Sequence, residues 1–119
     1  MTIHNFRELV AWQKAMQLTK AVYVLTKTFP SVEQYGLVSQ IQRAVVSIPS
    51  NIAEGQGRIT TKEFIRYLSM ARGSLWELST QIELCERLNY VNKSQTTEIH
   101  NLITVIAKML NALSNAISD

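Results

Sequence analysis

Hydrophobic side chains recur at steps of three and four residues along most of the chain, and this spacing gives an α-helix one apolar face. The clearest run lies between Thr60 and Asn89. Its apolar positions form a heptad seam: Phe64, Leu68, Ala71, Leu75, Leu78, Ile82 and Cys85. Such a seam predicts a long helix that packs against other helices at a shallow angle. Thr60 and Glu63 have the spacing of a capping box at its start, and Asn89 is its expected end.

The same spacing predicts a first helix from Asn5 to about Thr28. Asn5 and Glu8 form a candidate capping box. Pro30 requires the helix to end, because the residue before a proline avoids helical backbone angles. The expected apolar face consists of Phe6, Leu9, Trp12 or Gln13, Met16 and Tyr23.

The second helix is predicted from Leu37 onward, and it contains a proline. Pro49 cannot donate a hydrogen bond to the carbonyl of Val45, and its ring crowds that carbonyl. We expect a kinked but continuous helix, because the apolar stripe keeps its phase beyond the proline. Gly55 and Gly57 are then expected to end the helix in the left-handed conformation. The stripe consists of Leu37, Ile41, Ala44, Val45, Ile48 and Ile52.

A final helix is predicted to start near Asn92 or Ser94. Its apolar positions are Ile99, Leu102, Ile103, Ile106, Leu110, Leu113 and Ile117. Its outer face is rich in Asn, Ser and Thr and carries little charge. Such a face suits either a surface covered by another subunit or a neutral surface in water.

Four helices with short connections predict one all-α domain over residues 1–119, an antiparallel up-down-up-down four-helix bundle. The chain has 4 Gly and 2 Pro, too few turn residues for a fold of many short strands. No apolar stretch is long enough to span a membrane, and the first residues contain no secretory hydrophobic region. We therefore expect a cytoplasmic protein. A single Cys excludes an intrachain disulfide.

The net charge of +3 is unevenly distributed. Residues 36–75 hold five basic and two acidic side chains, whereas residues 76–119 hold three basic and five acidic ones. An anionic partner is therefore expected to contact the first two-thirds of the chain. Lys62 and Arg66 share one face of the third helix, and Arg58 lies just before its N-terminus, where free N–H groups favour anions. The alternative is an ordinary solvated face with Glu63 alongside.

A polar stripe on the second helix also has two interpretations. One is a hydrogen-bonded network that offsets the disruption at Pro49 and pairs Glu54 with Arg43 or Arg72, since buried charges persist only when paired. The other is a polar surface that lines a subunit contact or a pore. The stripe consists of Arg43, Ser47, Ser50, Asn51 and Glu54.

The sequence gives no support for catalysis, a cofactor or a metal site. Cys85 falls on the core seam, where a cysteine behaves as a small hydrophobic residue. A nucleophile needs a nearby base, and the spacing of His4 and His100 suggests no partner for either. Glu98 and His100 point to different faces of their helix, and the four inward carboxylates of a bundle metal site are missing. The segment 53–58 lacks the pattern of a phosphate-binding loop.

Several segments together resemble one bacterial family of four-helix bundles, first named from proteins encoded in intervening sequences of 23S ribosomal RNA genes. The accessory variability proteins of diversity-generating retroelements are similar to it. The resemblance spans nearly the whole chain, and its most specific segment is Ser-Ile-Pro-Ser-Asn-Ile-Ala-Glu-Gly at residues 47–55. It rests further on Phe6-Arg7-Glu8-Leu9, Trp12-Gln13-Lys14-Ala15, Tyr35-Gly36-Leu37, Ser39-Gln40-Ile41, Arg43-Ala44 and Ala71-Arg72-Gly73-Ser74-Leu75.

The resemblance implies a barrel-shaped homopentamer with a central channel and no known catalytic activity. In the retroelement branch it implies a nucleic-acid-binding partner of a reverse transcriptase, and in the other branch a role with the ribosomal RNA insert. The expected function is thus binding of RNA or DNA backbone, and the alternative is a protein scaffold without nucleic-acid contact. Five copies would carry a charge of about +15. The candidate anion contacts are Arg43, Arg58, Lys62, Arg66 and Arg72, of which Arg43 and Arg72 have an internal position as their alternative.

Overall fold

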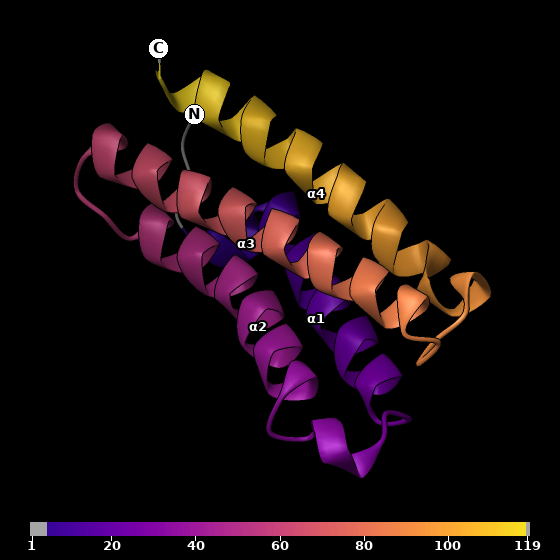
Figure 1. Ribbon diagram of the computed structural model, residues 1–119. Coiled ribbons are helices and arrows are strands. Elements are labelled where there is room, and N and C mark those ends of the chain that lie inside the picture. Colours follow the sequence, from indigo (N-terminus) through magenta and orange to yellow (C-terminus); the bar gives the residue numbers. More distant parts are fainter. Residues whose placement is uncertain (1–4, 119) are drawn as a thin grey trace.

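A computed structural model of the chain describes residues 5–118 and contains four α-helices (Figure 1). They are α1 (Val10–Thr26), α2 (Leu37–Gln56), α3 (Thr61–Arg87) and α4 (Lys93–Ser118). Two short 3₁₀ turns, η1 (Phe6–Glu8) and η2 (Ser31–Glu33), precede α1 and α2. The described residues form no β-strand, so the predicted all-α class is confirmed.

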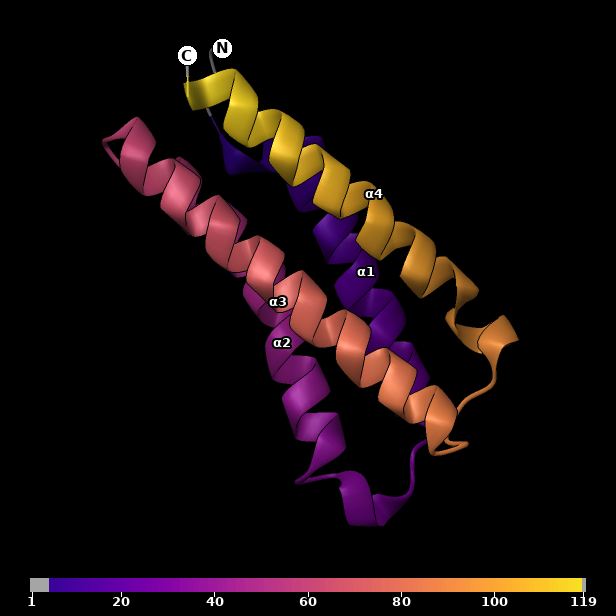
Figure 2. The same cartoon turned by 45° about the horizontal axis from the view of Figure 1, so that its top comes forward.

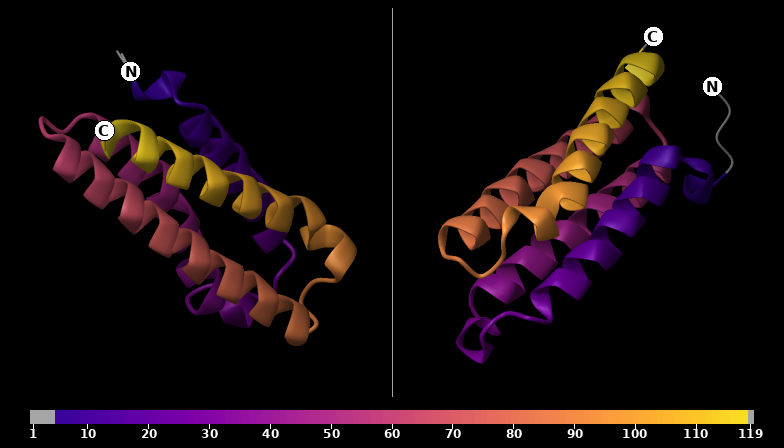
Figure 3. Two further views of the ribbon diagram at one scale, coloured as in Figure 1. Left: turned by 90° about the horizontal axis from the view of Figure 1, so that it is seen from above. Right: turned by 90° about the vertical axis from the view of Figure 1, so that its right-hand side faces the viewer.

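The helices form an elongated bundle that measures 45 × 25 × 19 Å. Each helix packs against the next one in the chain, and α1 also packs against α4. The α2–α3 turn lies at the same end of the bundle as both termini of the described chain (Figure 2). The α1–α2 and α3–α4 connections lie at the other end, and two further views show the four helices running alongside one another (Figure 3). The predicted four-helix bundle is therefore present.

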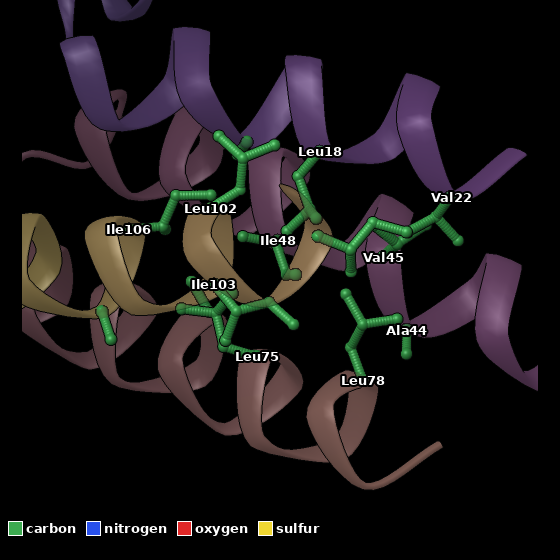
Figure 4. Close-up of a cluster of buried hydrophobic side chains, with 14 of the residues drawn as sticks. Leu18, Val22, Ala44, Val45, Ile48, Leu75, Leu78, Leu102, Ile103 and Ile106 are labelled. Carbon is green, nitrogen blue, oxygen red and sulfur yellow. The ribbon is translucent and has the colours of Figure 1, made fainter. Parts of the chain in front are cut away.

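All four helices contribute to a single hydrophobic core (Figure 4). Fully buried side chains include Leu18, Val22, Val45, Ile48, Leu75, Leu78 and Ile106. The predicted seam of α3 is buried from Leu68 to Cys85, with Phe64 half-buried at its start. Burial of this continuous seam fixes the rotation of α3 within the bundle.

The predicted apolar face of the first helix is only partly correct. Leu9 is buried and Trp12 packs against the core, but Met16 and Tyr23 are exposed. The buried side chains of α1 are Ala11, Ala15, Leu18, Val22, Leu25 and Thr26. The helix also starts five residues later than predicted, at Val10, because Leu9 adopts an extended conformation (φ −74°, ψ 121°). Asn5 caps η1 by accepting a hydrogen bond from the Arg7 N–H at 2.9 Å, whereas in the predicted box the donor is the Glu8 N–H.

The predicted ends of the later helices agree better with the structure. The Thr60 side chain accepts a hydrogen bond from the Glu63 N–H at 3.2 Å, and Asn89 leaves the helix in the left-handed region (φ 60°). Asn92 and Gln95 form a reciprocal capping box that starts α4. The Gln95 N–H donates to Asn92 Oδ1 at 3.1 Å, and the Asn92 N–H donates to Gln95 Oε1 at 2.9 Å.

The second helix runs without interruption through Pro49, as predicted. The Thr19 hydroxyl of α1 donates to the carbonyl of Ala15 at 2.8 Å and lies 3.4 Å from the carbonyl of Val45. Val45 is the residue whose carbonyl has no helical donor at position 49. A side chain of the neighbouring helix thus partly replaces the missing hydrogen bond.

Gly55 does not end α2 as predicted. It lies inside the helix and is buried, and no glycine of the described chain has a positive φ. Instead, Gly55 faces α3 at very short range. A Cβ atom at this position would lie 2.7 Å from the Cβ of Tyr67 and 3.0 Å from Cδ1 of Phe64. The glycine is therefore required for the close approach of two helices rather than for a turn.

Alanine at this position tests the close approach. Gly55→Ala is expected to destabilise the protein by about 1–3 kcal/mol, because overpacking forces the two helices apart. Gly73→Ala is a matched control in α3, where a new Cβ meets no atom within 4 Å. It is expected to stabilise the helix by about 0.5–1 kcal/mol. Urea unfolding measures both, and effects of the same sign would contradict this account.

Candidate nucleic-acid interface

Two of the predicted basic residues lie against one aromatic ring at the α2–α3 end of the bundle, and a third is close to them in the sequence. The guanidinium carbons of Arg58 and Arg66 lie 4.7 and 4.9 Å from the centre of the Tyr67 ring. Arg58 Nη2 also donates a hydrogen bond to the Tyr67 hydroxyl at 2.6 Å. Lys62 extends from the first turn of α3 and is exposed. We call Arg58, Lys62, Arg66 and Tyr67 the Tyr67 cluster.

The position of the Tyr67 cluster is fixed by the core. Tyr67 is 9% exposed, and its Cβ lies against Gly55 of α2. The arginines therefore lie against a ring that is packed between the two helices. Cation–π contacts of this kind and the hydrogen bond to the hydroxyl limit the freedom of the two guanidinium groups before any ligand binds.

Two carboxylates balance part of this positive charge. Glu54 lies 3.6 Å from Arg58, and Glu63 accepts hydrogen bonds from Arg66 at 3.3 and 3.4 Å. The hydrogen bond and charge of Arg66 lower the pKa of Glu63, and Glu63 in turn raises the pKa of Arg66. Lys62 forms no ion pair within residues 5–118. Three cations and two carboxylates leave the cluster with one net positive charge.

The predicted pairing of Glu54 with Arg43 or Arg72 is wrong. Glu54 pairs with Arg58, four residues later, because that partner is within reach on the same side of the helix end. Arg72 instead donates to Asn111 Oδ1 of α4 at 2.5 Å. Arg43 is exposed on α2 and forms no ion pair in the described chain.

Arg43 and Arg72 are thus both on the surface, and the alternative of an internal position is wrong for each. They do not join the Tyr67 cluster. Arg43 lies fifteen residues before Arg58, or roughly 20 Å along the helix. Arg72 faces the α3–α4 side of the bundle, in a cleft that it shares with Asn111.

Two members of the polar stripe of α2, Ser47 and Asn51, are hydrogen-bonded, as the network interpretation predicts for them. The hydroxyls of Ser47 and Ser74 lie 2.6 Å apart and join α2 to α3. The side-chain amide of Asn51 donates to the carbonyl of Ser47 at 2.8 Å. Ser50 is exposed. The stripe therefore contributes to the contact between the two helices.

The side chains suited to catalysis are placed as follows. Cys85 is fully buried, and burial raises the pKa of its thiol to about 11, so the reactive thiolate is suppressed. Within residues 5–118, no group of three or more His, Cys, Asp or Glu side chains could hold a metal ion. His4 lies outside the described residues.

Within residues 5–118, no helix is both long enough and apolar enough to cross a membrane.

His100 does have a partner, which its spacing in the sequence did not suggest. Its Nε2 lies 2.7 Å from Glu86 Oε2, and the Thr96 hydroxyl donates to the same carboxylate oxygen at 2.7 Å. The hydrogen bonds from His100 and Thr96 lower the pKa of Glu86. The spacing did not reveal this pair, because its members lie on two different helices, α3 and α4.

The carboxylate of Glu86 makes the stability of the fold depend on pH in a defined direction. The ionised form of Glu86 stabilises the fold above its ordinary pKa of 4.5, and that contribution is lost as the pH falls through the lower folded value. Glu86→Gln is therefore expected to cost more stability at pH 7 than at pH 3. Urea unfolding at the two pH values measures the difference, with Glu98→Gln on the exposed side of α4 as control. An equal cost at both pH values would contradict this role.

Comparisons with known proteins agree with the fold. A family model described as 23S rRNA-intervening sequence protein matches residues 7–112. The chain is also similar to a crystal structure of a protein of unknown function from the S23 ribosomal protein family of Bacteroides thetaiotaomicron VPI-5482. That similarity has a TM-score of 0.79 at 25% sequence identity and covers 87% of this chain and 97% of the other. A search of curated proteins finds no match.

Proposed function

Because the chain belongs to the 23S rRNA-intervening sequence protein family, we propose that it is a non-enzymatic protein that binds the backbone of RNA or DNA as an oligomer. The observation that carries this proposal is the Tyr67 cluster, in which a buried ring positions two exposed arginines, with the exposed Lys62 between them in the sequence. Phosphate contacts of this kind fix the position of a nucleic acid without reading its sequence.

The guanidinium groups keep donors for a ligand. Each arginine has five N–H donors, and the contacts with Tyr67, Glu54 and Glu63 use only some of them. With one net positive charge, a single cluster attracts a polyanion only weakly. Several copies on one assembly would act together on a single nucleic acid, because linked sites raise the effective concentration of each other.

Binding that depends on phosphate contacts must depend on salt. We expect a labelled structured RNA and a matched DNA duplex to bind at low salt and to dissociate as salt rises, as measured by fluorescence anisotropy. Replacing Arg58, Lys62 and Arg66 by Gln is expected to weaken binding at least tenfold. It should also reduce the slope of log affinity against log salt by up to about 3.

A control variant removes the same number of positive charges at the opposite end of the bundle. Lys27, Arg87 and Lys93 are all exposed there and are replaced by Gln together. This variant should retain most of the affinity. Equal losses in both triple variants would mean that only net charge matters, and the Tyr67 cluster would then have no special role.

We propose further that the oligomer is a homopentamer, as the family resemblance implies. Exposed apolar side chains on α1 and α2 support a contact between copies: Met16 is 46% and Val46 is 41% exposed. Together with Trp12 and Pro49 they line a shallow groove between the two helices. A contact there would remove apolar surface from water.

Light scattering at micromolar concentration tests the assembly. Five chains of 13.5 kDa predict a mass of about 68 kDa. Val46→Glu is expected to lower this mass, because it would place a charge in an apolar contact. Val105→Glu on α4 introduces the same charge outside the groove and serves as control. A monomeric mass for the unmodified chain would contradict the proposal.

A protein scaffold, for example for a reverse transcriptase, is the second candidate function. The exposed apolar side chains favour it as much as they favour self-association. A partner captured from the native host that stays bound after nuclease treatment and at high salt would support this function. Loss of all partners under both treatments would leave nucleic-acid binding as the better account.

A further inference from the structure

The third helix presents an unusual aromatic side chain to solvent. Trp76 is 53% exposed, although the large indole ring is normally well buried. The other tryptophan, Trp12, packs edge-on against Phe6 with ring centres 5.2 Å apart. Within residues 5–118, Trp76 has no such ring contact and no cation over its face. Its ring is therefore available to an external partner.

The helix leaves room beside this ring. Gly73 lies one turn before Trp76 and is exposed, and a Cβ at this position would meet no atom within 4 Å. Glycine weakens the interior of a helix, so the open space has a cost in stability. The indole of Trp76 therefore has no neighbouring side chain at position 73 on the outer side of α3.

A polar cleft adjoins the same stretch of helix. Arg72, four residues before Trp76, lines a cleft of about 380 Å³ between α3 and α4. Its polar lining comes from Arg72, Ser69, Asn111, Ser114 and Asn115, and it contains no carboxylate. Asn111 holds the Arg72 guanidinium in place. The cleft thus offers one fixed positive charge with hydroxyl and amide groups around it.

We propose that Arg72 and Trp76 together bind one unpaired nucleotide, with the base stacked on the indole and a phosphate held by the guanidinium in the cleft. This inference rests on the proposed function and makes it more specific: the nucleic acid is single-stranded where it crosses α3. A duplex hides the faces of its bases, whereas an unpaired base exposes a face that can stack on an aromatic ring.

The charge along α3 supports a path from the Tyr67 cluster to this site. Lys62 and Trp76 are fourteen residues apart, or about 21 Å along the helix. Lys62, Arg66 and Arg72 fall within this interval, and the only carboxylate between them, Glu63, is paired with Arg66. Glu77 and Glu83 follow Trp76, so the positive stretch ends at the indole. A strand that follows the basic side chains reaches the ring before it meets the acidic part of α3.

Tryptophan fluorescence tests the proposal directly. In a Trp12→Phe variant, the emission comes from Trp76 alone, because the chain has 2 Trp. A single-stranded oligo(U) probe is expected to quench this emission, and inorganic polyphosphate, which has charge but no bases, is expected to leave it unchanged. Equal quenching by polyphosphate would overturn the stacking contact.

Affinity measurements separate this inference from the proposed function. Trp76→Leu is expected to weaken binding of oligo(U) by roughly 5- to 100-fold, while binding of a DNA duplex stays unchanged. Leu84→Ala, which shortens another exposed side chain of α3, is the matched control and should have no effect on either probe. Unchanged oligo(U) affinity in Trp76→Leu, with salt-dependent binding retained, would overturn this inference alone. No binding of any probe at low salt would overturn the proposed function as well.

Discussion

The structure depends on the close approach of α2 and α3 at one end of the bundle, where Gly55 leaves no room for a side chain against Tyr67 and Phe64. This approach buries Tyr67, and the buried ring in turn supports the guanidinium groups of Arg58 and Arg66. The serine contact between Ser47 and Ser74 joins the same two helices farther along. A packing constraint in the core therefore determines where the surface charge lies.

At the Tyr67 cluster, positive and negative charges nearly balance, so this surface is not strongly basic. Each arginine of the Tyr67 cluster has a carboxylate within 4 Å, so the local field comes mainly from the unpaired lysine and from the direction of the remaining N–H donors. Exposed ion pairs contribute little to stability. Their more important effect here is on orientation, since they hold long side chains in one arrangement. Such a surface favours many weak contacts acting together over one tight contact.

Much of the fold could be predicted from the sequence, because strong local patterns determine it. The heptad seam of α3, its Thr60 cap and its Asn89 end all follow from residues close in sequence. The face of α1 was missed because its core positions include Ala11 and Ala15, which give a weak apolar signal beside the exposed Met16. The Glu86–His100 pair and the surface position of Arg72 depend on how helices dock, which spacing along one helix does not reveal.

The turn at residues 57–60 also has a kinetic consequence. It connects two helices whose tightest contact, between Gly55 and Tyr67, joins residues only twelve positions apart. Closing so short a loop costs little chain entropy, so this hairpin can assemble early on the folding pathway, as can the α3–α4 hairpin, where Thr96 and Glu86 are ten residues apart. The Tyr67 cluster would then be complete before α1 has docked. Substitutions around Gly55 should accordingly slow the folding rate more than they accelerate unfolding.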